Sequence, residues 1–201
     1  MSMEAAASQA DVYAGGFAEP GREASVAFRG VLDALARPGR IVEITGATPS
    51  GALPPASGAA LLCLADPDAP VWYAPDLGGD SADWVLFHTG APRAASRDVA
   101  AFALGRWEDL MPLADWPAGT ADYPDRSTTL LICLPSLEGG PRLRLEGPGI
   151  EGAVEVAPAL PPDAATVLSA NRARFPLGVD LFLVAGNRLM GLPRSTRVTA
   201  V

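Results

Sequence analysis

Lysine is absent from this chain, and all 15 of its basic residues are arginine. Enzymes that form a Schiff base with pyridoxal phosphate or with a carbonyl substrate need a lysine amine, so the sequence excludes that chemistry. A phosphate-binding P-loop also needs a lysine, and no such motif occurs. Two large classes of enzyme are therefore ruled out before any motif is considered.

Metal ligands are also scarce. The chain has a single histidine, His88, and two cysteines, Cys63 and Cys133, which lie far apart in apolar runs. No pair of these residues has the spacing of a zinc or iron–sulfur site, although a magnesium site built from carboxylates stays open. Neither cysteine has a cationic neighbour in sequence, so we expect both to be buried and unreactive.

Targeting and membrane signals are missing too. The first residues lack the basic and apolar regions of a signal peptide. The longest uncharged stretch, residues 46–65, contains several prolines and glycines and is not predicted to span a membrane. We therefore expect a cytoplasmic protein with no membrane partner. Its net charge of −8 also argues against a nucleic-acid partner.

The residues that are present predict an α/β fold, with a mixed sheet covered by helices. Apolar residues make up 49% of the chain and charged residues 19%, which excludes intrinsic disorder. An apolar stripe at helical spacing predicts a helix over residues 22–36, formed by Ala24, Ala27, Phe28, Val31, Leu32 and Leu35. Further helices are expected over residues 57–65 (capped by Ser57), 80–87, 107–113 and 162–172.

Strands are expected where apolar runs meet turn residues. The uninterrupted run at 128–134 is typical of a strand buried on both faces. Gly186-Asn187 predicts a hairpin between its flanking apolar segments. The expected strands cover residues 40–44, 71–73, 128–134, 142–145, 179–185 and 188–192, while 99–104 fits a strand or a helix equally well. We expect a flexible N-terminus over residues 1–15 and a single domain over 16–201.

His88 is the first candidate for chemistry. It is the only side chain whose ordinary pKa lies near neutrality, which makes it a candidate acid or base. A histidine that satisfies a backbone carbonyl or lies in an interface is the alternative, and we favour it. The glycine-rich segment 146–152 could form an anion-binding nest, but Pro148 removes a donor and glutamates flank the loop, so a sharp turn is preferred.

Five arginines are candidates for binding an anion or a partner. Arg37 and Arg40 flank the rigid Pro38-Gly39 turn and could bind phosphate, although a helix C-terminus also attracts cations for structural reasons. The C-terminal residues 164–201 are locally basic on an acidic protein. There, Arg172, Arg174 and Arg194 could contact ATP phosphates or an acidic partner, or they could pair with carboxylates of the same chain.

Several short motifs, taken in order, resemble one family. They are residues 16–20 (GFAEP), 28–41 (FRGVLDALARPGRI), 87–92 (FHTGAP), 147–150 (GPGI), 175–180 (FPLGVD) and 192–196 (LPRST). Together they resemble the H-subunit (PhnH) family of the bacterial carbon–phosphorus lyase system, from Gly16 to Val201. The chain departs from that pattern at Glu19, where aspartate is expected, and at Ser195, where threonine is expected.

The resemblance implies a fold similar to that of pyridoxal-phosphate-dependent transferases, but without the cofactor site. It implies work alongside the G, I and J subunits of the complex. The implied reaction transfers the ribosyl triphosphate of MgATP to an alkylphosphonate and releases adenine, with MgATP as substrate of the assembled complex and no cofactor bound by this chain. The resemblance and the four tryptophans also lead us to expect a homodimer.

Three functions remain open at this point. The first is a non-catalytic accessory subunit of that complex. The second is a catalytic or substrate-binding subunit that contributes His88 and arginines to a composite ATP or phosphonate site. The third, apart from the family, is a stand-alone domain that binds a small molecule.

Overall fold

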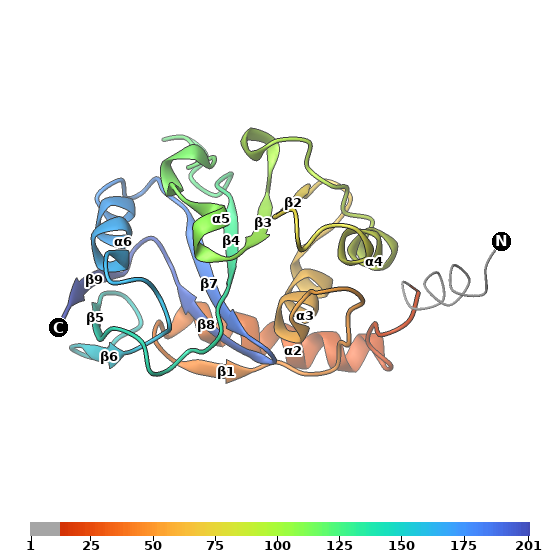
Figure 1. Ribbon diagram of the computed structural model, residues 1–201, viewed down its shortest axis with the longest axis horizontal. Coiled ribbons are helices and arrows are strands. Elements are labelled where there is room, and N and C mark those ends of the chain that lie inside the picture. The colour runs from red at the N-terminus through yellow and green to blue at the C-terminus, as the bar shows by residue number, and fades with distance from the viewer. Residues whose placement is uncertain (1–12) are drawn as a thin grey trace.

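The computed structural model describes residues 13–201 and contains two sheets (Figure 1). The larger sheet has six strands in the order β1-β8-β7-β4-β3-β2, and the smaller has three in the order β6-β5-β9. The strands of the larger sheet are β1 (Ile41–Glu43), β2 (Val71–Tyr73), β3 (Phe102–Gly105), β4 (Thr129–Cys133), β7 (Asp180–Ala185) and β8 (Arg188–Leu192). Those of the smaller are β5 (Leu143–Glu146), β6 (Val154–Val156) and β9 (Arg197–Ala200).

The larger sheet is mixed, as the sequence predicts. Strands β2, β3, β4 and β7 run parallel, whereas β8 returns antiparallel to β7 through the predicted turn at Gly186-Asn187, and β1 is antiparallel to β8. The central strand β4 alternates between two hydrophobic clusters: Leu130 and Ile132 face one and Leu131 faces the other. Burial on both faces is the physical reason for its uninterrupted apolar sequence.

Two layers cover the larger sheet. One face carries α2 (Pro20–Ala36), α3 (Pro55–Leu64) and α4 (Asp80–Thr89). The other carries α5 (Trp107–Leu110), α6 (Ala164–Arg172), the 3₁₀ turn η2 (Leu113–Asp115) and the smaller sheet. In Figure 1, α3 and α4 lie at the right and α2 along the bottom, whereas α5, α6 and the smaller sheet lie at the left. No helix among the described residues is both long and apolar enough to cross a bilayer.

Several sequence predictions need correction. Residues 99–104, which fit a strand or a helix in sequence, contain the last residue of a 3₁₀ turn, η1 (Arg97–Val99), and then strand β3. Strands β6 and β9 were not predicted. Ser57 does not cap α3: the helix begins at Pro55, and the buried Ser57 hydroxyl has no hydrogen-bond partner within the described residues.

The structure confirms the predicted helix as α2. The apolar stripe of this helix is wider than the face that is buried against the sheet. Ala27, Val31 and Ala34 are buried against the sheet. Phe28 and Leu32, which the stripe predicts to be core residues, are 40% and 47% exposed. The helix therefore carries an apolar ridge that residues 13–201 leave partly exposed.

Candidate functional site

His88 lies in the last turn of α4, beside a cavity of about 410 Å³. The cavity is formed where the start of α2, the end of α3 and the segment before α2 come together. It is lined by Tyr13, Gly15, Gly16, Phe17, Pro20, Ala24, Leu62 and His88. His88 is the one titratable side chain here apart from the phenol of Tyr13, so any acid or base chemistry in this cavity depends on it.

The imidazole of His88 is held by its neighbours. Its Nε2 lies 3.3 Å from the carbonyl oxygen of Ala14, which also accepts a hydrogen bond of 2.7 Å from the indole N–H of Trp84. The ring packs against those of Trp84 and Phe87. A side chain at Gly16 would lie within 2.8 Å of Nδ1, so the backbone there closely covers the second ring nitrogen.

These contacts indicate a structural role for His88. With its proton on Nε2, His88 donates to Ala14 and helps to hold the segment that leads into α2. The same segment is fixed by the Gly15 carbonyl, which accepts a hydrogen bond from the Thr48 N–H. The predicted flexible N-terminus falls mostly outside the described residues, and Ala14 and Gly15 are bonded as above.

Arg37 and Arg40 converge on a single carboxylate. An Arg37 guanidinium nitrogen lies 2.5 Å from Asp33, and one of Arg40 lies 3.0 Å from the other oxygen of Asp33. Both arginines are more than half exposed, so the ion pairs contribute little to stability. The turn thus matches the structural alternative, in which the two cations lie at the C-terminus of α2 and balance an acidic residue of that helix.

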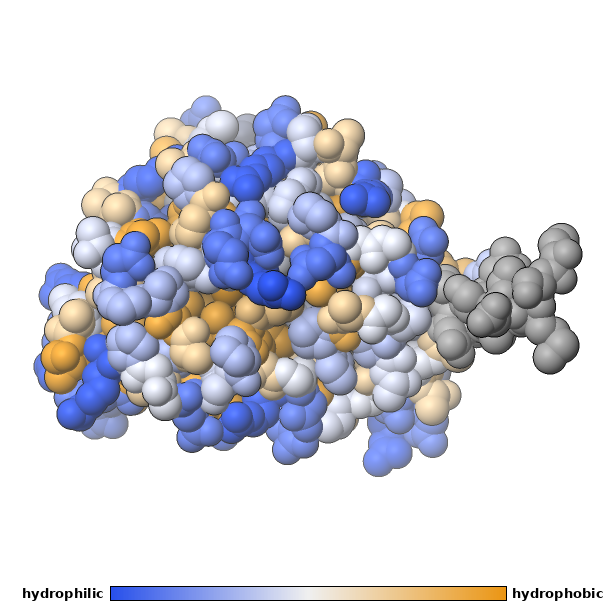
Figure 2. Space-filling view, viewed as in Figure 1, coloured by the Kyte–Doolittle hydropathy of each residue, from blue (hydrophilic) through white to orange (hydrophobic). Residues whose placement is uncertain are grey.

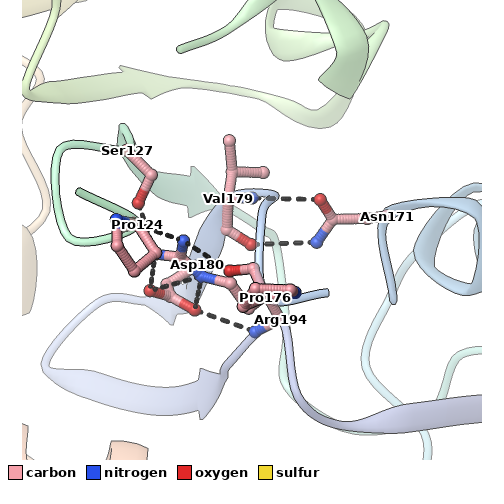
Figure 3. Close-up of polar contacts among 7 residues, drawn as sticks. All are labelled: Pro124, Ser127, Asn171, Pro176, Val179, Asp180 and Arg194. Atoms are coloured by element: carbon pink, nitrogen blue, oxygen red, sulfur yellow. Dashed lines mark hydrogen bonds and ion pairs between the residues drawn. The ribbon is translucent and has the colours of Figure 1, made fainter. Parts of the chain in front are cut away.

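Arg194 is largely enclosed, with 11% of its side chain exposed (Figure 3). Its Nε and one terminal nitrogen bond the two carboxylate oxygens of Asp180. The guanidinium also donates to the carbonyl of Pro124 at 2.8 Å and to the hydroxyl of Ser127. One side chain therefore joins the start of β7, the loop before β4 and the connection after β8.

Arg172 and Arg174 follow each other in sequence but differ in their contacts. Arg172 donates from Nε to the Ser195 carbonyl at 2.9 Å and packs over the ring of Phe175. Arg174 is exposed and has no side-chain ion pair within residues 13–201. Of the C-terminal candidates, Arg174 is therefore the one whose guanidinium is free for an anion.

The structure does not bring His88 and these arginines together. His88 belongs to α4, whereas Arg172 belongs to α6, and the two helices lie at opposite ends of Figure 1. Within the described part of the chain, no group of three or more His, Cys, Asp or Glu side chains is placed to hold a metal ion. A composite site of His88 and arginines would have to draw its second half from another chain.

The glycine-rich segment 146–152 is a turn, as preferred from the sequence. Gly147, Gly149 and Gly152 all have positive φ, and Gly149 passes so close to the end of α2 that a side chain there would meet the Ala36 carbonyl. The segment thus packs its backbone against a helix end and connects β5 to β6.

One arginine with an extensive set of contacts was missed. Arg97 packs over the rings of Trp72 and Trp116 and donates to the Asp109 carbonyl at 2.7 Å. Its partners lie at Trp72 and within residues 109–116, so nothing in the sequence next to Arg97 indicates these contacts. The four tryptophans are accounted for here, since Trp84, Trp107 and Trp116 are buried and Trp72 is partly buried.

A second cavity of about 410 Å³ opens between the two sheets. Its apolar surfaces come from Ile41, Leu137, Val156 and Met190, and Figure 2 shows apolar surface among hydrophilic side chains near the position of β8. The charged residues on its margin, Glu138, Arg142 and Glu155, are committed to ion pairs within the chain. This cavity therefore presents mainly an apolar surface.

Comparison with known proteins assigns the family. The model of the family described as bacterial phosphonate metabolism protein (PhnH) matches residues 15–199. The chain belongs to the PhnH family. It is 44% identical over 194 residues, 94% of this chain and 97% of the relative, to alpha-D-ribose 1-methylphosphonate 5-triphosphate synthase subunit PhnH of Rhizobium meliloti (strain 1021). It is 33% identical over 174 residues, 86% of this chain and 84% of the relative, to a protein of Stutzerimonas stutzeri named "Putative C-P lyase subunit protein HtxG".

Proposed function

We propose that this chain is an accessory subunit of a carbon–phosphorus lyase complex in phosphonate catabolism and carries no catalytic residue of its own. The assembled complex would transfer the ribosyl triphosphate of MgATP to an alkylphosphonate and release adenine. The observation that carries the proposal is the match along almost the whole length of a relative named as a subunit of ribose 1-methylphosphonate 5-triphosphate synthase. The G, I and J subunits of the same system are its proposed partners.

The site geometry supports an accessory role. The Nε2 of His88 contacts a backbone carbonyl, and Arg194 is saturated by Asp180, Pro124 and Ser127. Groups that are already bonded within the chain are poor candidates for stabilising charge that develops on a substrate. The proposed likeness to pyridoxal-phosphate-dependent transferases fits this role, because a lysine-free chain cannot hold that cofactor as an aldimine.

The cavity beside His88 favours a second candidate function. At about 410 Å³ it falls in the size range of small-molecule sites, and it is mainly apolar with one imidazole at its wall. In that case the chain would bind part of a substrate while a partner subunit supplies the charged groups. Binding of MgATP or adenine to the isolated chain, measured by calorimetry, separates this candidate from the accessory role.

Reconstitution tests the main proposal. The G, I and J subunits are co-expressed with and without this chain, and adenine release from MgATP and methylphosphonate is measured. We expect the four-subunit complex to form and release adenine, the omission to lower release strongly, and the isolated chain to release none. Adenine release by the isolated chain, or full activity without it, would contradict the proposal.

A further inference from the structure

Two segments that are far apart in the sequence meet at the amino-terminal ends of β4 and β7. They are residues 117–128, which precede β4, and residues 173–179, which precede β7. One terminal nitrogen of Arg194 donates to the carbonyls of both Pro124 and Pro176, at 2.8 and 3.4 Å (Figure 3). The two segments therefore lie side by side and are fixed to each other through one side chain.

Each segment exposes an aromatic ring that supports a guanidinium group. Tyr123 is 51% exposed and Phe175 is 50% exposed. The guanidinium carbon of Arg126 lies 4.1 Å from the centre of the Tyr123 ring, and that of Arg172 lies 4.9 Å from the centre of the Phe175 ring. Stacking on a ring holds a guanidinium in place while N–H groups in its plane can still donate. Such a group is preorganised to bind a carboxylate.

Unpaired positive charge is concentrated at the same place. Ten of the 15 arginines form an ion pair within residues 13–201. Of the five that do not, three lie here: Arg126, Arg172 and Arg174. Two acidic residues, Asp122 and Asp125, belong to the first segment, and the second segment has none. This surface is thus net positive on a chain whose net charge is −8.

The end of helix α6 accounts for only one of these cations. Arg172 lies in the last turn of α6, where the helix dipole favours a positive charge, and its Nε donates to the Ser195 carbonyl at 2.9 Å. Arg174 lies beyond the helix, and Arg126 lies in the loop before a strand. Both are exposed. Their charges are therefore available to a partner.

The shape and composition of this surface fit a protein better than a small molecule. Small-molecule sites are concave, and neither of the cavities described above is lined by these residues. Arginine and tyrosine often dominate the binding energy of protein–protein interfaces, and phenylalanine is enriched there. A protein segment can offer carboxylates to the guanidinium groups and apolar atoms to the rings at the same time.

We propose that the surface formed by Tyr123, Arg126, Arg172, Arg174 and Phe175 binds an acidic segment of a partner subunit. Carboxylates of that segment pair with the guanidinium groups, and its other side chains cover the two rings. The inference rests on the proposed function, because it requires the chain to work in an assembled complex. It adds the place and the charge of one contact in that complex.

Co-expression of the tagged chain with the G, I and J subunits tests the proposal. Mass spectrometry measures how much of each subunit is recovered with the tag. We expect Arg126→Glu/Arg174→Glu to lower the recovery of at least one subunit tenfold or more, because like charges then face each other. The matched control is Arg29→Glu/Arg93→Glu, which changes the net charge equally at the other two arginines without an ion pair. It should leave recovery unchanged, and circular dichroism melting checks that each variant folds.

The rings give a second readout in the same experiment. Tyr123→Ser should lower recovery at least fivefold, because it removes both a half-exposed ring and the support of the Arg126 guanidinium. Leu86→Ser is the control, since Leu86 is 49% exposed but lies on α4, in the layer that covers the opposite face of the larger sheet. It should recover the subunits in wild-type amounts.

The proposal is overturned if Arg126→Glu/Arg174→Glu recovers the subunits in wild-type amounts, or if the control pair lowers recovery equally. It is also overturned if calorimetry shows that the isolated chain binds MgATP and that this double variant does not, because the surface would then hold a small anion. Equal recovery by the wild type and the double variant leaves the accessory function intact. A wild-type chain that recovers none of the three subunits contradicts the proposed function itself, so the two proposals fail in different ways.

Discussion

Arg194 and Asp180 form a two-pronged ion pair that links the two ends of the hairpin β7–β8. The closest contact is 2.5 Å, and the backbone N–H of Arg194 also donates to the same carboxylate at 2.8 Å. Asp180 has 24% of its side chain exposed, and both of its carboxylate oxygens bond the guanidinium. Of the alternatives that the sequence leaves open for Arg194, the structure thus matches pairing with a carboxylate of the same chain.

Replacing Arg194 with alanine should therefore destabilise the fold. The change removes the ion pair together with the hydrogen bonds to Pro124 and Ser127, while the backbone N–H of residue 194 can still donate to Asp180, so we expect a loss of about 1–3 kcal/mol. The control is Arg174→Ala, an exposed change without an ion pair, which should alter the free energy of unfolding by less than about 0.5 kcal/mol. Urea unfolding measures both, and equal effects would show that Arg194 is not a structural centre.

Part of this architecture could be predicted from sequence. The uninterrupted apolar run of β4 and the Gly186-Asn187 hairpin are local patterns, and the structure confirms both. Strands β6 and β9 have three and four residues and are stabilised by pairing with β5, so their own sequence carries little signal. The pairing of β9 with β5 also joins residues more than 50 positions apart, such as Glu146 and Arg197, and cannot be deduced from periodicity.

The contacts of the candidate site residues also fall into two groups: those that the local sequence indicates and those that it does not. Asp33 lies four residues before Arg37, a spacing that pairs side chains on one helix face, so that ion pair could have been anticipated. The partners of Arg194 at Pro124 and Ser127 are separated from it by 70 and 67 residues. The contact of His88 with Ala14 spans 74 residues. Only the folded chain reveals that these groups are already engaged.

Gly149→Ala should be one of the most damaging single changes in the glycine-rich turn. Gly149 has φ +81°, and an added Cβ would lie 1.9 Å from the Ala36 carbonyl oxygen, so both strain and a backbone clash result. Gly152→Ala is the matched control, with φ +68° and open space around the added atom. The control should cost about 1–2 kcal/mol and Gly149→Ala clearly more, as measured by urea unfolding. Equal losses would exclude the clash as a cause.

The two cysteines should react slowly while the chain is folded. Burial raises the pKa of Cys63 and of Cys133 from 9.0 to about 11. At pH 8 the folded chain should then hold roughly 100-fold less thiolate than the unfolded chain, so alkylation should slow by a similar factor. Labelling with iodoacetamide with and without urea, read by mass spectrometry, measures this. A cysteine labelled equally fast in both states would contradict its burial.

The same shifts predict how stability depends on pH. The folded thiols bind their protons more tightly than the unfolded ones, because their pKa is raised. Their contribution to stability is therefore fully present below about pH 9 and is lost as pH rises towards about 11. Replacing both cysteines with alanine should flatten the stability curve in this alkaline range, as followed by urea unfolding at several pH values.

Replacing His88 with glutamine decides between an accessory and a catalytic role for this chain. Because Nε2 contacts the Ala14 carbonyl at 3.3 Å and Gly16 covers Nδ1, we expect His88→Gln to change turnover per assembled complex by less than tenfold. Replacement of a positioned acid or base would instead lower turnover about 10²–10⁴-fold.

Trp84→Phe is the control, since it removes the other donor to the same carbonyl without touching an ionisable group. Both variants should lower thermal stability and leave turnover nearly intact. A hundredfold loss for His88→Gln alone, in a complex that gel filtration shows to be assembled, would place His88 in the reaction and overturn the accessory role.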